Sequence, residues 1–330
     1  MRLENSWGKI KNSILRSYHP VRYAAVLLLV LSFISVCNAA PEKPKKKRTK
    51  NVVILVIDGP RYTETWGDPS LQYIPNMAKT LRPQGTFFSH FYNDGYTYTT
   101  SGHTAITTGV RQPIDNDGLE LPLNPSIFQA WLKKSGKAAT KAWIIASKDK
   151  LSVLANTTNP EWKDTYQPES NCGTDGVGNG YRADSTTIRV AKQILTKHKP
   201  NLVLINLLQP DGAGHAANWE AYLRGISTSD HYAKLLWDFI QINKNYKDKT
   251  ALLITNDHGR HLDGILDGYV SHGDDCEGCR HISLLALGPD FQKGLIIETT
   301  YNLTDIATTV AQLLKFRIPT SQGKIIRELL

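Results

Sequence analysis

The sequence predicts an α/β protein with a doubly wound, mostly parallel central sheet and helices on both faces. Short apolar runs alternate along the chain with segments of helical periodicity, which is the order typical of strand–helix–strand units. The runs at 51–57, 201–208 and 250–255 are mostly apolar, so these strands are expected to be buried, as in a parallel sheet. Three of them are soon followed by an Asp, which predicts a group of carboxylates at one edge of the sheet.

The expected strands are rich in β-branched residues and cover residues 51–57, 86–92, 141–146, 201–208, 250–255 and 282–287. The expected helices carry apolar residues at helical spacing and cover residues 75–81, 126–134, 183–197, 219–246 and 304–314. Between them, residues 156–181 and 260–280 are rich in Gly and polar residues and are predicted to be long loops. No sharp change of composition divides residues 51–330, which we expect to form one domain.

The N-terminal region differs from the rest of the chain. Residues 1–39 have a basic start, an apolar run at 24–36 and small residues after it, a pattern typical of a secretory signal peptide. The run is shorter than the roughly 20 residues of a membrane span. An N-terminal anchor through residues 24–37 is the alternative interpretation. Either way we expect an exported protein, periplasmic or secreted, followed by a basic linker over residues 40–50.

The positive charge of the chain lies outside the predicted domain. The formal net charge is +9, of which residues 1–39 contribute +4 and residues 40–50 contribute +5. The remainder is neutral, which argues against a nucleic-acid-binding surface. Residues 1–50 are instead suited to contact with an anionic membrane surface.

The four cysteines are Cys37, Cys172, Cys276 and Cys279. An exported protein can form disulfides, and Cys276-x-x-Cys279 is only half of a zinc ribbon. We therefore expect a structural disulfide there in preference to a metal site. The pairing among Cys172, Cys276 and Cys279 stays open.

Asp58, Asp211 and Asp257 follow three of the predicted strands and should meet at one sheet edge. His258 directly follows Asp257, and His215 lies one helical turn after Asp211. Asp and His together are ligands suited to zinc. Two Asp–His pairs and a third Asp predict two divalent metal ions, a pair that can activate a nucleophile and hold a leaving oxygen.

A hydroxyl-rich stretch at residues 97–109 stands ahead of a short apolar run. Ser or Thr at such a place normally caps a helix. A helix N-terminus also favours anions, and a metal ion nearby makes a hydroxyl far easier to deprotonate. One of these hydroxyls is therefore a candidate nucleophile toward a phosphate or sulfate.

These motifs together resemble the alkaline phosphatase superfamily, with its nucleotide pyrophosphatase/phosphodiesterase branch the nearest. The matching pieces are Asp58-Gly59-x-Arg61, Pro210-Asp211-x-x-Gly214-His215, Asp257-His258-Gly259, and His272-Gly273 ahead of a strand that ends at Gly288-Pro289. The resemblance implies a catalytic domain over residues 51–330 that uses two divalent metal ions, with zinc the preferred metal.

The resemblance also implies roles for single residues. In this superfamily the nucleophile usually lies ten residues before the Gly that ends the following helix. With Gly109 as that Gly, the nucleophile would be Thr99, with Thr100 and Ser101 as alternatives. Asn116 is the expected phosphate contact, and Asn93 competes with it. His103 is expected to pack or bond near the site. One metal ion would be held by Asp58, Thr99, Asp257 and His258, and the other by Asp211, His215 and His272, with His281 as the alternative last ligand.

The predicted reaction is hydrolysis of a small phosphorylated substrate through a phosphothreonine. A sulfatase is disfavoured because residues 99–103 lack the Cys/Ser-x-Pro-x-Arg motif that the resemblance would require. The lack of Arg in residues 99–109 favours a diester or nucleotide pyrophosphate over a monoester, although Arg182 is a second potential source of positive charge. Two further alternatives are a phospho-group transferase and a non-catalytic binding module. The sequence does not predict an oligomeric state.

Overall fold

A nine-stranded mixed sheet runs through residues 48–330, the part of the chain that the computed structural model describes. Its order is β4-β3-β5-β1-β6-β7-β2-β8, with β9 paired to β2. The strands are β1 (Asn51–Ile57), β2 (Thr86–Tyr92), β3 (Ala142–Ala146), β4 (Glu169–Cys172), β5 (Leu202–Leu207), β6 (Thr250–Asn256), β7 (His281–Leu287), β8 (Leu295–Ile297) and β9 (Tyr301–Asn302).

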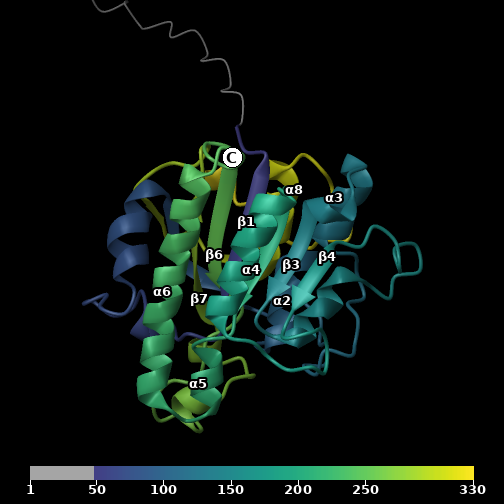
Figure 1. The fold of residues 1–330 in the computed structure, drawn as a ribbon. Helices are drawn as coiled ribbons and strands as arrows, with labels where there is room; N and C mark the ends of the chain where they lie inside the picture. The colour runs from purple at the N-terminus through teal and green to yellow at the C-terminus, as the bar shows by residue number, and fades with distance from the viewer. Residues whose placement is uncertain (1–47) are drawn as a thin grey trace, which may run out of the picture. The chain divides into compact units, whose positions relative to one another are not determined.

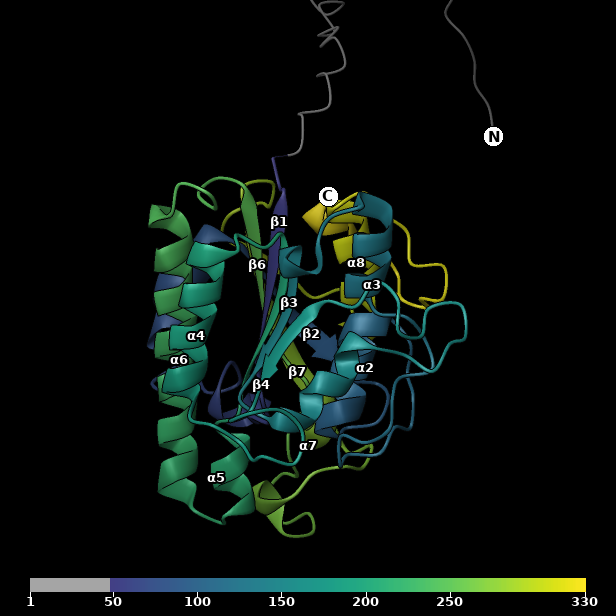
Figure 2. The same ribbon diagram turned by 45° about the vertical axis from the view of Figure 1, so that its right-hand side comes forward.

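Helices cover both faces of this sheet (Figures 1 and 2). The α-helices are α2 (Thr99–Thr108), α3 (Ile127–Ser135), α4 (Asp184–Lys197), α5 (Asp211–His215), α6 (Trp219–Ile242), α7 (Glu277–Arg280) and α8 (Leu303–Leu313). A π-helix spans Asn76–Leu81, and short 3₁₀ turns lie at Tyr62–Glu64, Arg82–Gln84, Ala139–Lys141, Asp149–Ala155, Gly268–Val270 and Arg327–Leu329.

The core has two halves, one on each face of the sheet. Successive residues of a strand point to opposite faces. Val52, Ile54 and Val56 of β1 accordingly pack with α2, α3 and α8. The intervening residues of β1 pack with α4 and α6. Figure 2 shows the resulting three layers, with α4 and α6 on one side of the sheet and α2, α3 and α8 on the other. The continuous apolar runs in the sequence reflect this burial on both faces.

The expected fold class is confirmed, and each predicted strand is present within one residue at either end. The strands β3, β5, β1 and β6 are mutually parallel, but β7 runs antiparallel to both β6 and β2. Strand β4 lies inside the predicted loop 156–181. Its sequence Glu-Ser-Asn-Cys is polar because it is an edge strand, so it carries no apolar run to reveal it.

Two other expectations differ from the structure or fall beyond it. Cys172, Cys276 and Cys279 are all free thiols, so the disulfide expected at Cys276-x-x-Cys279 is wrong for this structure. The predicted signal or anchor at residues 1–39, and most of the basic linker, lie outside the described residues. Among residues 48–330, no helix has the length and apolar character needed to cross a membrane.

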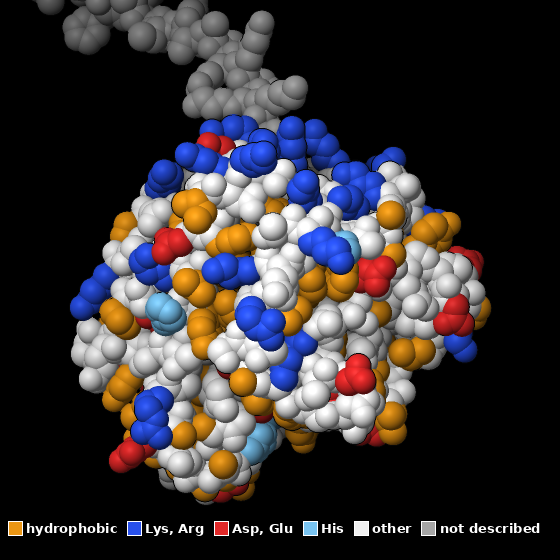
Figure 3. All heavy atoms as spheres, in the orientation of Figure 1, with side chains coloured by type: hydrophobic (Ala, Val, Ile, Leu, Met, Phe, Trp, Pro, Cys, Tyr) orange, Lys and Arg blue, Asp and Glu red, His pale blue; other side chains and the backbone are white. Residues whose placement is uncertain are grey.

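Lys and Arg side chains gather at the end of the molecule where the parallel strands begin (Figure 3). Lys50, Lys199 and Lys249 are exposed there, next to the first residues of β1, β5 and β6. The carboxyl ends of the same strands, and the Asp residues that follow them, lie at the opposite edge of the sheet.

Candidate active site

The three predicted carboxylates meet at the carboxyl edge of the sheet. Strand β1 lies between β5 and β6 in parallel register, with Ile57 opposite both Leu207 and Asn256. Asp58 and Asp257 directly follow the ends of β1 and β6, and Asp211 begins α5 after β5. All three side chains are buried. Parallel register thus brings together acids that are far apart in the sequence.

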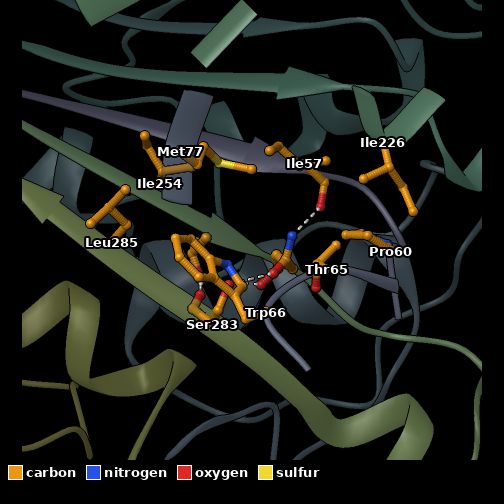
Figure 4. A pocket seen from close by; sticks show the side chains of 11 residues that line it. Ile57, Pro60, Thr65, Trp66, Met77, Ile226, Ile254, Ser283 and Leu285 are labelled. Carbon is orange, nitrogen blue, oxygen red and sulfur yellow. Dashed lines mark hydrogen bonds between the residues drawn. The ribbon is translucent and has the colours of Figure 1, made fainter. Parts of the chain in front are cut away.

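Asn256 joins the ends of three strands just before Asp257. Its Nδ2 donates a hydrogen bond to the carbonyl of Ile57 (3.1 Å), and its Oδ1 accepts one from Ser283 Oγ (3.2 Å). These residues line a small cavity of about 10 Å³ together with apolar side chains that include Trp66 (Figure 4). The hydrogen bonds hold the ends of β1, β6 and β7 in a fixed relation beneath the carboxylates.

One group of metal-ligand atoms comprises Asp58, Asp257 and His258, whose donor atoms lie within 4.8 Å of one another. His258 Nε2 is 3.5 Å from an oxygen of each carboxylate. Its Nδ1 faces the carbonyl of Gly259 at 2.8 Å, which fixes the ring and leaves Nε2 for a metal ion. Burial lowers the pKa of His258 to about 3, so the ring is neutral, the form that binds metals.

The same group contains buried polar atoms that a metal ion would satisfy. Asp257 Oδ2 and His258 Nε2 are buried and have no hydrogen-bond partner. Burial, followed by the neighbouring charge of Asp257, raises the pKa of Asp58 to about 7. Buried polar atoms without partners and crowded carboxylates are costly, and a divalent cation among them would remove both costs. The residues therefore fit a metal ion.

Asp211, His258 and His272 form a second group of metal-ligand atoms, and the predicted ligand His215 lies at its exposed edge. His215 Nε2 lies 3.3 Å from Asp211 Oδ1 and 3.1 Å from His272 Nε2, and His272 Nε2 lies 3.4 Å from Asp211 Oδ1. The ring of His272 stacks on that of His258 with a centroid distance of 3.7 Å. Its Nδ1 faces the carbonyl of Thr97 at 2.7 Å. The two predicted ligand sets are therefore adjacent.

His281 lies apart from both groups. Its ring stacks between Tyr62 and Tyr92, with centroid distances of 3.8 and 4.7 Å, and its Nε2 is 2.9 Å from the carbonyl of Ser89. Of the two alternatives for the last ligand, the structure brings His272 to the cluster.

Thr99 is the first residue of α2, and its side chain faces the carboxylates. Its Oγ1 accepts a hydrogen bond from Lys148 Nζ at 2.9 Å. The other candidate hydroxyls turn elsewhere. Thr100 Oγ1 donates to Asn116 Oδ1 (3.0 Å), and Ser101 Oγ donates to the carbonyl of Ile114 (3.4 Å). Thr99 is thus the hydroxyl of this trio that reaches the candidate metal ligands.

Close packing holds α2 against the end of β6. A Cβ on Gly102 would lie 2.6 Å from the carbonyl oxygen of Asp257, so only glycine fits. His103 is fully buried one turn into the helix, with Nδ1 2.8 Å from the carbonyl of Thr99 and Nε2 3.2 Å from Asn206 Nδ2. The expectation that His103 bonds near the site is confirmed.

Lys148 was not predicted, yet it lies at the centre of the cluster. It follows β3, is 2% exposed, and its Nζ lies 2.9 Å from Asp58 Oδ1 and 2.6 Å from Asp211 Oδ2. Burial opposes its charge, but Asp211 and Asp58 outweigh burial and raise its pKa, so the ammonium stays protonated. A lysine after a strand carries no motif, and only the position of β3 beside β5 would have indicated it.

Asn116 and Lys150 form the outer part of the site. Asn116 Oδ1 accepts hydrogen bonds from the backbone amide of Thr100 (3.0 Å) and from Lys150 Nζ (2.9 Å), which leaves Nδ2 as the amide's remaining donor. Burial and the charge of Lys148 lower the pKa of Lys150 to about 8. Asn93, the competing amide, donates instead to the carbonyl of Asp257 (2.8 Å).

The surrounding arginines have structural partners. Arg260 is fully buried, binds Asp211 through Nη1, and donates from Nη2 to the carbonyl of Val270 (2.6 Å). It thereby ties Asp211 to the loop that carries His272. Arg61 pairs with local acids, and Arg182 binds Thr187 and Asn171, so neither side chain contacts the cluster in the structure.

The family of the chain follows from a comparison with known sequences. A family model described as the Metalloenzyme superfamily matches residues 74–318. The chain belongs to this superfamily. The match covers Thr99 and both metal-ligand groups apart from Asp58.

Solved structures show that this metalloenzyme has the fold of the alkaline phosphatase superfamily. A phosphonate monoester hydrolase from Silicibacter pomeroyi superposes with a TM-score of 0.62 at 14% identity, covering 84% of this chain and 76% of that one. An inactive threonine-to-alanine variant of murine ectonucleotide pyrophosphatase/phosphodiesterase 5, in complex with AMP, gives 0.58 at 15% identity, covering 83% and 97%. A variant of alkaline phosphatase PafA gives 0.62 at 13% identity, covering 86% and 99%.

Part of the chain is also similar in sequence to a curated protein. The metalloenzyme is 28% identical over 133 residues to a 2,3-bisphosphoglycerate-independent phosphoglycerate mutase from Gracilaria tenuistipitata var. liui. The aligned part covers 40% of this chain and 24% of that relative, so the match spans a quarter of the relative's length.

Proposed function

We propose that this metalloenzyme hydrolyses phosphate monoesters, with Thr99 as the nucleophile. The observation that carries the proposal is the contact between Thr99 Oγ1 and the buried ammonium of Lys148, which also binds Asp58 and Asp211. A hydroxyl beside a fixed cation and two candidate metal-ligand groups suits attack on an anionic phosphoryl group.

Two divalent metal ions, with zinc preferred, would be held by these residues. Asp58, Thr99, Asp257 and His258 would bind one ion, and Asp211, His215 and His272 the other. When bound, such a pair supplies positive charge that favours ionisation of a nucleophile and stabilises a leaving oxygen. The two buried atoms without partners, Asp257 Oδ2 and His258 Nε2, support this assignment.

The residues of the chain would then act as follows. Thr99 Oγ1 attacks phosphorus, the bond to the leaving alcohol breaks, and water later hydrolyses the phosphothreonine. Lys148 holds the nucleophile, and its charge attracts the phosphoryl group. Asn116 Nδ2 and Lys150 Nζ donate to phosphoryl oxygens. The position of Thr99 at the start of α2 adds the favourable end of the helix dipole.

Lys148 and Lys150 favour a monoester substrate, whereas the lack of Arg in residues 99–109 had favoured a diester. A monoester dianion carries one more negative charge than a diester, and Lys148 and Lys150 supply positive charge on the Thr99 side of the cluster. The alkaline phosphatase structure compared above is altered at a Thr, an Asn, a Lys and an Arg. Here Thr99 accepts a hydrogen bond from Lys148, and Asn116 accepts one from Lys150 and another from the neighbouring Thr100.

The test compares Thr99→Val with the matched control Thr100→Val, using 4-nitrophenyl phosphate, bis(4-nitrophenyl) phosphate and 4-nitrophenyl phenylphosphonate. We expect Thr99→Val to lose about 10³-fold or more in kcat/KM for the monoester, because the covalent route is gone. Thr100→Val should retain activity within about tenfold. Monoester hydrolysis by Thr99→Val at the wild-type rate would contradict the proposed nucleophile. A diester rate above the monoester rate would assign the site to a phosphodiesterase.

A transfer reaction is the second candidate, favoured by the relative that is named a mutase. The phosphothreonine would then pass its phosphoryl group to an alcohol in place of water. Adding glycerol or another acceptor alcohol and measuring phosphorylated acceptor against inorganic phosphate separates the two reactions. Release of inorganic phosphate alone at high acceptor concentration assigns the enzyme as a hydrolase.

We further propose that the chain is exported, on the basis of the apolar run at residues 24–36 and its flanking residues. N-terminal sequencing of the protein from cell fractions tests this. A mature protein that begins near residue 40 in an extracytoplasmic fraction supports signal cleavage, and a full-length protein in the membrane fraction supports the anchor. Full-length protein in the cytoplasm contradicts export.

A further inference from the structure

A third cluster of metal-ligand types lies next to the candidate active site. It contains His261, Asp274, Cys276 and Cys279, whose donor atoms all lie within 4.8 Å of one another. All four residues belong to the segment between β6 and β7, and none is part of the two groups described above. The reaction proposed above makes no use of them.

We propose that this cluster binds a structural zinc ion. Two Cys, one His and one carboxylate make a four-ligand set of the kind that zinc binds in a closed tetrahedral site. Ligand atoms around such an ion lie roughly 3.3 to 3.8 Å apart, given typical bond lengths of about 2.0 to 2.3 Å. The donor atoms here are spread over at most 4.8 Å, so a contraction of about 1 Å would complete the site.

His261 is oriented as a metal ligand. It is 3% exposed, and its Nδ1 lies 3.0 Å from Ser271 Oγ, which leaves Nε2 to face the cluster. Nε2 is buried without a hydrogen-bond partner, although Asp274 Oδ2 is 3.1 Å away. A metal-binding imidazole usually donates its other N–H to an oxygen atom, and Ser271 Oγ occupies that position here. A cation between Nε2 and the carboxylate would satisfy both atoms.

Cys276 and Cys279 are also positioned to act as metal ligands. Cys276 precedes α7 and Cys279 lies one turn later, with the Cys279 amide donating to the carbonyl of Cys276 at 3.1 Å. Both are free thiols, and Cys276 also donates its amide to Asp274 Oδ1 at 3.1 Å. A Cys276–Cys279 disulfide would leave His261 Nε2 without a partner, whereas a zinc ion uses both sulfurs, the imidazole and the carboxylate.

The ion would hold the loop that positions two active-site histidines. Asp274 lies two residues after His272, and its carbonyl accepts a hydrogen bond from Thr97 Oγ1 (2.6 Å). The carbonyl of Cys279 accepts one from the amide of Gly259 (2.8 Å), the residue after His258. A zinc ion that joins His261, Asp274 and α7 would therefore restrain the backbone next to both His258 and His272.

The test uses the full-length protein purified with zinc under reducing conditions. The variant Cys276→Ser/Cys279→Ser is compared with Cys172→Ser, which removes a buried thiol outside the cluster. We expect the double variant to hold about one zinc ion fewer per chain than wild type, and the control to match wild type. Equal metal content in all three proteins would overturn the proposal.

Cobalt substitution gives a readout that does not require the variant to fold. Wild type and Cys172→Ser loaded with Co²⁺ should show sulfur-to-cobalt charge-transfer absorption, because only this cluster offers two thiolates to one ion among the described residues. The thiols of Cys276 and Cys279 should become reactive only after a chelator has removed the metal ion. A wild-type protein without this absorption, or one isolated with an intact Cys276–Cys279 disulfide by mass spectrometry, would refute the zinc site.

Discussion

The ammonium of Lys148 lies 2.9 Å from the hydroxyl oxygen of Thr99, and it simultaneously binds the carboxylates of Asp58 and Asp211. Lys148 follows β3 and Thr99 begins α2, so the contact joins residues that are 49 positions apart in the sequence. A cation fixed between the proposed nucleophile and the candidate metal ligands connects the electrostatics of the site with the proposed chemistry.

Replacing Lys148 by Met removes the charge and keeps an unbranched side chain. We expect kcat/KM for 4-nitrophenyl phosphate to fall by about 10²- to 10³-fold, the usual cost of losing one fixed donor to a reacting anion. Lys134→Met, at an exposed position on α3, serves as the matched control. A change of less than about twofold in Lys148→Met would show that this ammonium does not act on the transition state.

Lys150 should make the activity of the enzyme fall at alkaline pH. Its pKa is lowered to about 8, so the ammonium is charged below that pH and neutral above it. Because the neutral amine no longer attracts a phosphoryl dianion, kcat/KM for the monoester should fall as the pH rises through 8. Lys150→Arg should keep its charge and lose this fall, and Lys150→Met should be low at every pH. If both variants keep the same fall in kcat/KM at alkaline pH, that fall is due to another group.

Asp257→Asn should weaken one of the two proposed metal sites. Asp257 is fully buried, and its Oδ2 has no hydrogen-bond partner, so the carboxylate is available to an ion. We expect the purified variant to contain about one divalent ion fewer per chain than wild type, by elemental analysis, with loss of activity. Asp238→Asn, exposed on α6, should match wild type in both measurements. Wild-type metal content in Asp257→Asn would remove this residue from the ligand set.

Chelation should inactivate the enzyme and lower its thermal stability together. Asp58, Asp211 and Asp257 are buried, and Lys148 and Arg260 are the cations that contact Asp58 or Asp211 in the structure. Metal ions that bind the folded state stabilise it in proportion to their affinity and concentration. We expect the melting temperature to fall after chelator treatment and to recover, with activity, on addition of Zn²⁺. Full activity in metal-free protein would exclude metal-dependent catalysis.

Asp230 should matter for folding and not for chemistry. It is 1% exposed on α6 and accepts hydrogen bonds from the amides of Asn76 (2.9 Å) and Met77 (2.7 Å) at the start of the π-helix. Asp230→Ala leaves these donors unpaired and should lower the free energy of unfolding by about 2 to 3 kcal/mol. Asp238→Ala on the same helix breaks an exposed pair with Lys234 and should cost less than about 0.5 kcal/mol. Urea unfolding measures both, and equal effects would contradict the structural role.

Much of the sheet was predictable because burial leaves a local signal. A strand covered on both faces needs a mostly apolar run, and β1, β5 and β6 each have one. Strand β4 lacks this signal because it lies at the sheet edge, and its polar side chains reach solvent. The antiparallel direction of β7 was also not predictable, since a strand's own residues do not state the direction of its neighbours.

The sequence by itself determined the residues that a metal-dependent site would use at the strand ends. Asp58, Asp211 and Asp257 each follow an apolar run, and parallel strands place their carboxyl ends together. His258 adjoins Asp257 and His215 lies one turn from Asp211, so these pairs are set by short-range geometry.

Only the tertiary structure decided which cations complete the site and how Thr99, which the resemblance had already selected, comes to face it. Thr99, Thr100 and Ser101 are chemically similar neighbours, and the rotation of α2, set by Gly102 against β6, turns Thr99 toward the carboxylates. Lys148 and Arg260 reach Asp211 from different elements. Long side chains can extend in many directions, and their contacts depend on strand order and packing across the whole sheet. No local pattern in the sequence encodes that arrangement.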